Sequence, residues 1–182
     1  MPYAATHILA AILLAELFRH YVIKNNKIFP RYYILIAAIG GILPDFDFGI
    51  FYTLSLFGFG FSIEEIHRTF LHTLFVPLLL FIIGFIAMIF NVKLKEISKH
   101  HLKIPIVFYI LAIGSLLHLI LDATFFGEIT PFYPFSSFSV GLNILYTLPL
   151  SWRGSFLPAL DGVLLVLWIL WLEFKLKISN YF

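Results

Sequence analysis

The sequence predicts an all-α integral membrane protein, a helical bundle of about five transmembrane helices. Hydrophobic residues make up 61% of the 182 residues, charged residues make up 12%, and the mean hydropathy is +0.98. A soluble domain of this length carries about twice that share of charged residues. The apolar runs are also too long for a soluble core, so we expect a single membrane-embedded domain over residues 1–182.

Five apolar segments account for the predicted spans. They cover residues 3–22, 32–50, 68–90, 104–126 and 158–174. Pro44 interrupts the second segment, so its regular helix should end near Leu43. Residues 127–157 are rich in Pro, Gly, Ser and aromatic residues, and we expect them to form an interfacial or re-entrant loop before the last span.

The basic residues predict how the bundle is oriented. Of the twelve Lys and Arg residues, all but Arg68 and Arg153 lie on one side of the five-span arrangement. The positive-inside rule therefore places the N-terminus outside and the C-terminus in the cytoplasm of a multi-pass cell membrane protein. The first segment has no basic residue before its apolar run, so we expect it to stay as a span rather than to be cleaved as a signal peptide.

Composition excludes several classes of function and site. The net charge is only +2 and the basic residues are not concentrated, so a nucleic-acid-binding surface is not expected. Because the chain has no cysteine, it has no disulfides and no thiolate metal site. The expected partner is the lipid bilayer, and any metal must be bound by His and carboxylate side chains.

Eight residues of metal-ligand type lie towards the outer ends of the five spans in this orientation. They are His7, Asp45, Asp47, His67, His72, His118, Asp122 and Asp161. An unpaired charge at the centre of a membrane helix costs about 2.5–3.5 kcal/mol, so carboxylates there need a compensating partner. A shared divalent cation would supply one. Imidazole and carboxylate ligands suit Zn²⁺, with Mn²⁺ or Fe²⁺ left open, and eight residues allow either two metals or one metal with outer partners.

The spacing of these residues supports some ligand pairs more than others. His118 and Asp122 are four residues apart and therefore lie on one face of a helix. His67 and His72 are five apart and converge only if His67 precedes the helix. Asp161 could instead cap the last span, and His7 could be solvated near the start of the chain.

Several short motifs together resemble one known family. The sequence contains TH at 6–7, GILPDFD at 41–47, HRTFLH at 67–72, HLILDATFFG at 118–127 and PFS at 134–136. In order and approximate spacing these motifs resemble the YdjM/DUF457 family, whose members are described as membrane-bound metal-dependent hydrolases. The resemblance implies a metal-binding role for His7, Asp45, Asp47, His67, His72, His118 and Asp122. Asp161 is added from its position only.

The leading functional hypothesis is a metal-dependent hydrolase that acts near the outer membrane face. A divalent metal would generate hydroxide from bound water, and Asp45, Asp47 or Asp122 would act as general base. Arg68 is either an interfacial residue that reaches the headgroups or a fork that binds a phosphate or carboxylate of the substrate. The depth of the site suggests a lipid or lipid-linked ester or phosphoester as substrate.

The alternative hypothesis is a non-enzymatic metal or proton carrier that uses the same His and Asp residues as a relay. A carrier should also place polar residues along a path to the cytoplasmic side. Only Glu16 lies deep in a span, and it is expected to pair with Arg19 or His20 one helical turn away. This asymmetry favours a catalytic site over a transport path.

Overall fold

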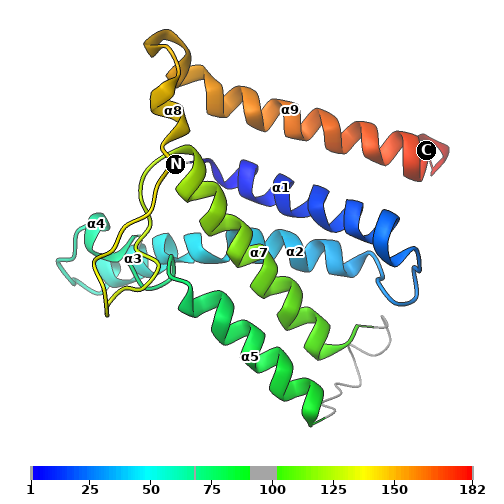
Figure 1. Ribbon diagram of the computed structural model, residues 1–182, viewed down its shortest axis with the longest axis horizontal. Coiled ribbons are helices and arrows are strands. Elements are labelled where there is room, and N and C mark those ends of the chain that lie inside the picture. Colours follow the sequence, from blue (N-terminus) through cyan, green and yellow to red (C-terminus); the bar gives the residue numbers. More distant parts are fainter. Residues whose placement is uncertain (1, 68, 91–101, 182) are drawn as a thin grey trace.

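The computed structural model describes residues 2–67, 69–90 and 102–181, which form helices joined by short turns and one long loop (Figure 1). The α-helices are α1 (Ala4–Leu17), α2 (Tyr32–Ile42), α3 (Phe46–Leu56), α4 (Ile63–Ile66), α5 (Phe75–Ile89), α7 (Ile104–Phe125), α8 (Ile144–Thr147) and α9 (Leu150–Leu176). A π-helix (Phe18–Ile23), a 3-10 turn (Leu43–Asp45) and a 3-10 helix (Ile178–Tyr181) complete the described elements.

Four helical stretches are long and apolar enough to cross a membrane. They are Ala4–Ile23, Tyr32–Leu56, Ile104–Phe125 and Leu150–Leu176. The fifth apolar helix, α5, has 15 residues and is shorter than a typical span. The prediction of an all-α membrane bundle is confirmed.

The starts of two predicted spans differ from the structure. Helix α5 begins at Phe75, whereas the sequence suggested residue 68, because the preceding turn bonds to the distant loop: the Leu74 N–H donates to the Pro131 carbonyl at 3.0 Å. Helix α9 begins at Leu150 and runs through Pro158, which the sequence suggested as its first residue. The predicted loop 127–157 is therefore helical over its last part.

The second span continues through its proline. Helix α2 ends at Ile42, close to the expected end at Leu43. Pro44 has no N–H for a helical bond, and the chain passes through one 3-10 turn before α3 resumes and extends to Leu56. The span is thus longer than the predicted 32–50.

Helices α1, α2 and α7 approach one another closely because glycines lie where they cross. A Cβ atom on Gly114 of α7 would lie 2.7 Å from the carbonyl carbon of Gly40 in α2. A Cβ atom on Gly41 would lie 2.7 Å from the His7 carbonyl oxygen of α1. Small residues at membrane helix crossings permit this close contact between backbones. The crossing brings His7 of α1 next to α2 and α7.

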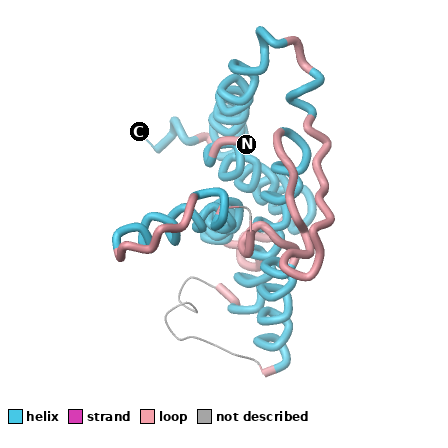
Figure 2. Tube along the Cα trace, turned by 90° about the vertical axis from the view of Figure 1, so that its left-hand side faces the viewer, coloured by secondary structure: helices cyan, strands magenta, loops and turns pink. Residues whose placement is uncertain are grey.

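The long loop between α7 and α8, the extended pink segment in Figure 2, lies against the turn that precedes α5. Besides the Leu74–Pro131 hydrogen bond, the Phe70 ring contacts Tyr133 edge-on at 5.2 Å, and Phe75 contacts Phe135 at 5.6 Å. The α7–α8 loop therefore packs against the turn before α5 and stabilises it.

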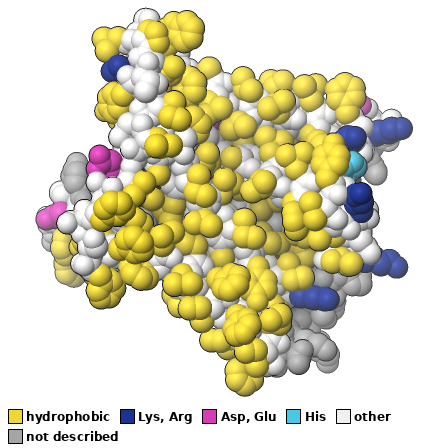
Figure 3. Space-filling view, in the orientation of Figure 1, with side chains coloured by type: hydrophobic (Ala, Val, Ile, Leu, Met, Phe, Trp, Pro, Cys, Tyr) yellow, Lys and Arg dark blue, Asp and Glu magenta, His cyan; other side chains and the backbone are white. Residues whose placement is uncertain are grey.

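The two ends of the bundle differ in charge. Most of the described Lys and Arg side chains gather at the end where α1 and α9 finish and α2 and α7 begin, and apolar side chains cover the surface between the ends (Figure 3). Arg153 lies at the other end, where its guanidinium donates to the Tyr146 and Leu148 carbonyls of the α8–α9 corner. The basic asymmetry of the sequence is thus an asymmetry of the folded bundle.

Candidate metal centre

Three buried side-chain atoms that could coordinate a metal lie close together at the end of the bundle opposite the basic end. They come from two parts of the chain. His118 Nε2 lies 3.2 Å from His72 Nε2, and each of these nitrogens lies 3.5 Å from Asp122 Oδ2. All three side chains are 0% exposed. In a tetrahedral site with metal–ligand bonds of 2.0–2.1 Å, neighbouring ligand atoms are about 3.4 Å apart. The three atoms therefore match one face of such a ligand shell.

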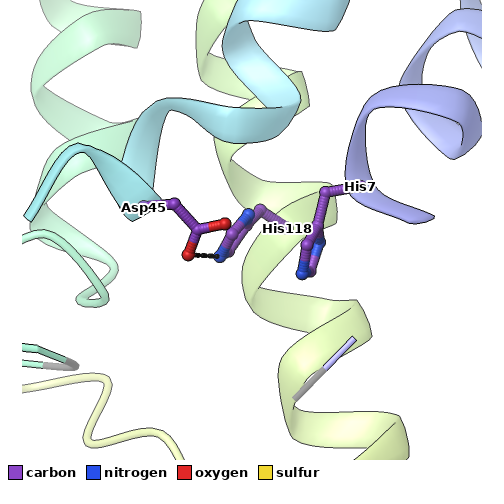
Figure 4. Close-up of side chains that lie close together, drawn as sticks. All are labelled: His7, Asp45 and His118. Atoms are coloured by element: carbon purple, nitrogen blue, oxygen red, sulfur yellow. Dashed lines mark ion pairs between the residues drawn. The ribbon is translucent and has the colours of Figure 1, made fainter. Parts of the chain in front are cut away.

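Asp45 adds a further donor beside this triangle. Its Oδ1 atom lies 3.5 Å from His118 Nε2 and 3.6 Å from His72 Nε2. Figure 4 shows the Asp45 carboxylate directed at His118 from the turn between α2 and α3. With its side chain 15% exposed, Asp45 is the least buried of the four residues, so it lies on the side from which water or a ligand can approach.

Asp47 holds two histidines in place. Its Oδ2 atom lies 2.9 Å from His67 Nδ1 and 3.0 Å from His72 Nδ1. The His67 contact is a hydrogen bond, and the His72 contact is a charge contact that leaves His72 Nε2 on the side of the triangle. Such carboxylate–histidine pairs orient metal ligands in many sites. Asp47, His67 and His72 could also hold a cation by themselves, but the Asp47 contacts favour an outer, orienting role.

His118 is oriented in the same way by the backbone. Its Nδ1 atom lies 2.8 Å from the Gly41 carbonyl, to which it donates, so Nε2 is the unprotonated nitrogen that faces His72 and Asp122. His118 Nε2 is then an acceptor that lies beside the Asp45 and Asp122 carboxylate oxygens. An arrangement of buried acceptors needs a cation or a proton among them.

His7 lies directly beside this cluster. Its ring lies against that of His118 (Figure 4), with ring centroids 3.7 Å apart and an interplanar angle of 19°. His7 Nε2 lies 3.4 Å from Asp122 Oδ1. One donor atom each from His7, Asp45 and His118 also lie within 4.8 Å of one another. His7 can therefore act either as a ligand or as the partner that fixes Asp122.

Asp161 stands apart from the other predicted metal ligands. Asp161 lies within α9, where it accepts a hydrogen bond from Thr6 Oγ1, and it belongs to none of the donor groups found among residues 2–67, 69–90 and 102–181. Arg68 lies outside the described residues. The structure thus brings together seven of the eight predicted metal ligands.

Local sequence explains how each part of the cluster is positioned. The 3-10 turn at Pro44 directs Asp45 and Asp47 from the joint between α2 and α3. The four-residue spacing of His118 and Asp122 keeps both on one face of α7, as predicted. His67 ends α4 in an extended conformation and His72 follows in the turn before α5, so both histidines precede that helix.

The carboxylates also control the charge of His72. Burial lowers the pKa of His72, but the neighbouring Asp45 and Asp47 carboxylates outweigh this effect and raise it to about 9. Without a metal, a proton on His72 would compensate part of the negative charge. A bound cation would replace that proton.

Two contributors were missed at the sequence level. The Gly41 carbonyl accepts from His118, and the Thr6 hydroxyl links the start of α1 to Asp161. Both are part of the short motifs GILPDFD and TH, but a backbone carbonyl and a small hydroxyl are not recognised as site residues from spacing. The roles of the Gly41 carbonyl and the Thr6 hydroxyl become visible only from the side chains that lie next to them in the structure.

Comparison with known proteins identifies the family of the chain. Residues 1–179 match the family model described as YdjM inner membrane protein, so the chain belongs to this family. No curated protein and no solved structure matches the chain. The family match agrees with the apolar helices in placing the protein in a membrane, where His and Asp groups that could bind a metal lie at one end of the bundle.

Proposed function

We propose that this protein is an integral membrane metal-dependent hydrolase whose divalent cation is held by His72, His118 and Asp122. The observation that carries the proposal is the triangle of buried donor atoms, 3.2–3.5 Å apart, with two histidines oriented by outer acceptors. Three protein ligands with a further position open to water are typical of catalytic zinc sites. The nitrogen and oxygen ligands favour Zn²⁺, with Mn²⁺ and Fe²⁺ as alternatives.

Asp45 is the best candidate for the general base. A divalent cation bound here would lower the pKa of a coordinated water and polarise an ester or phosphoester. All three carboxylates face histidine nitrogens, but Asp47 and Asp122 are buried, whereas Asp45 is more exposed and lies beside two of the proposed ligands. Its carboxylate can accept a proton from water on the open side or serve as a fourth ligand.

An apolar groove next to the centre supports a lipid-like substrate. A cavity of about 180 Å³ between α1, α2 and α7 is lined by Ala11, four residues after His7, and by Gly114, four residues before His118, each on the same helix face as that histidine. Leu14 and Ile113, which also line it, are exposed on the surface that would face lipid. An acyl chain could lie there with its ester close to the cluster.

The carrier hypothesis receives less support from the structure. Residues 8–15 of α1, between His7 and Glu16, are all Ile, Leu or Ala. Glu16 itself is engaged by Arg19, with Arg19 Nη1 3.4 Å from Glu16 Oε2. The expected Glu16–Arg19 pair is confirmed, and it lies within an apolar core rather than on a polar path.

The proposal is tested with protein reconstituted into vesicles and a panel of lipid phosphoesters and carboxylic esters. Wild-type protein should release product in a metal-dependent way, and His118→Ala should abolish the reaction. His20→Ala, which changes an exposed histidine at the basic end, is the matched control and should retain activity. Equal hydrolysis by wild type and His118→Ala would contradict the proposal, and metal-dependent ion flux without hydrolysis would favour the carrier.

The orientation belongs to the same proposal: the basic end faces the cytoplasm and the metal centre lies near the outer face. The chain has no cysteine, so single cysteines give an unambiguous test. In whole cells, Ser62→Cys beside α4 should react with an impermeant thiol reagent, and Ser179→Cys near the C-terminus should not. Labelling of both positions from outside would contradict the orientation.

A further inference from the structure

We propose that a groove at the basic end, between α2 and α9, binds one anionic phospholipid, with its phosphate at Arg31 and an acyl chain along the apolar walls. This site lies at the opposite end of the bundle from the metal centre. It does not depend on the proposed hydrolase activity.

The groove has the shape and lining that an acyl chain requires. Its volume is about 450 Å³, and α1 contributes to it through Glu16. Trp168, Leu172 and Leu176 of α9 line one wall at four-residue spacing, which places them in one stripe along the helix. That stripe is about 12 Å long at 1.5 Å per residue. Leu35 of α2 faces the same space.

The charge at the groove is positive because its one lining carboxylate is already compensated. Glu16 is 3% exposed and pairs with Arg19, whose guanidinium also donates to the Phe29 carbonyl and to Asn26 Oδ1. Arg31 lines the groove at the start of α2 and is exposed. Within the part of the chain that the structure describes, Arg31 forms no ion pair with a carboxylate. Its charge is therefore available to an anion.

Other charged groups near the mouth favour the same ligand. Lys175 and Lys177 lie at the end of α9. They flank Leu176 in the sequence, and Lys177 precedes Ile178; Leu176 and Ile178 both line the groove. Glu173, the acidic residue of this segment, accepts hydrogen bonds from the Ser179 hydroxyl and N–H. Basic side chains near a membrane surface attract anionic lipid headgroups.

A phospholipid satisfies both parts of the groove, whereas free phosphate satisfies only one. Phosphate alone would pair with the Arg31 guanidinium and leave the wall of Leu35, Trp168 and Leu172 uncovered. A zwitterionic lipid would fill the walls but would bring no net negative charge to Arg31. An anionic phospholipid provides both contacts.

The test measures phospholipid retention by the purified full-length protein with native mass spectrometry. Wild-type protein should retain one phosphatidylglycerol in preference to phosphatidylcholine. Arg31→Gln should weaken phosphatidylglycerol binding about tenfold, the effect of losing one charge-assisted contact of about 1.4 kcal/mol. Lys24→Gln is the matched control, since it removes an exposed charge at the same end from a residue that does not line the groove, and it should bind as wild type does.

A second variant tests the apolar walls separately. Leu172→Trp keeps every charge but fills part of the groove, so it should also reduce retention of phosphatidylglycerol. An unfolding midpoint and a gel-filtration profile in detergent that match those of wild type would show that both variants are folded. If Arg31→Gln and Leu172→Trp both retain phosphatidylglycerol as wild type does, the proposal is wrong. It is equally wrong if inorganic phosphate at millimolar concentration displaces the lipid, because the apolar walls then contribute nothing.

Discussion

The bundle contains two buried clusters of ionisable side chains, and they are built on opposite principles. At the basic end, Glu16 and Arg19 neutralise each other, and Arg19 has further acceptors in Asn26 and the Phe29 carbonyl. At the other end, His118 donates outwards through Nδ1, His72 Nδ1 lies 3.0 Å from an Asp47 oxygen, and the two Nε2 atoms face each other and Asp122. The first cluster is an ion pair whose Arg19 has two further acceptors, whereas the second gathers His and Asp atoms that could hold a metal ion. Burial of charge alone therefore does not identify a functional site, whereas the convergence of several possible ligand atoms indicates one.

The largest expected effect comes from removing a proposed ligand without changing its shape. Asp122→Asn keeps the size of the side chain but removes the charge that faces His72 and His118. We expect bound divalent metal to fall by at least ~100-fold, because loss of an outer-shell partner alone costs 10–100-fold. Elemental analysis of protein purified without chelators measures this. Glu16→Gln should keep its metal, and equal metal contents in these two variants would remove the distinction between the clusters.

The second prediction concerns the basic-end cluster. Glu16→Gln leaves the Arg19 guanidinium buried without its counter-ion and should destabilise the fold by about 3 kcal/mol, as expected when one partner of a buried ion pair is removed. Thermal or denaturant unfolding in mild detergent measures the loss. The double variant Glu16→Gln/Arg19→Met should recover part of it, because no uncompensated charge then remains. A single variant as stable as wild type would show that this pair is not the structural cluster described above.

The sequence predicts features that depend on neighbouring residues better than features that depend on contacts between residues far apart in the chain. Composition and the lysines predict the helical bundle and its two unlike ends, and the four-residue spacing predicts the His118–Asp122 pair. The start of α5 was missed because a contact between Leu74 and Pro131, residues far apart in sequence, sets it. Hydropathy likewise placed the start of the last span at Pro158, although the helix accommodates that proline.

The different contacts of Asp45 and Asp47 could also not be predicted from the sequence. Both carboxylates follow Pro44, and spacing alone makes them equivalent candidates. The 3-10 turn gives them different directions: Asp45 faces the Nε2 atoms of His72 and His118, and Asp47 faces Nδ1 atoms. Local backbone geometry, which no residue pattern specifies fully, decides which carboxylate lies beside the Nε2 atoms of His72 and His118.

The third prediction tests this difference in contacts. Asp47→Asn should weaken binding of the cation about 10–100-fold by loosening His67 and His72, while a detectable site remains. Competition with a chelator of known affinity gives the change. Glu128→Gln is a suitable control, because Glu128 is exposed and bonds to Ser139 in the loop. Complete loss of metal in Asp47→Asn would instead make Asp47 a direct ligand.

The smallest effect is expected at Asp161, the predicted ligand that the structure places apart from the donor groups. Asp161 accepts from Thr6, one residue before His7, so its role is to fix α9 against the start of α1. Asp161→Asn retains an acceptor oxygen and should leave metal affinity within about threefold of wild type, because no donor atom of the triangle moves. Thr6→Val removes the donor and should cost about 0.5–1.5 kcal/mol of stability, the usual contribution of one hydrogen bond. Titration of metal into each purified variant, together with its unfolding curve, separates these effects. A hundredfold loss of affinity in Asp161→Asn would return this residue to the ligand set, since a hydrogen bond that survives the substitution cannot account for such a loss.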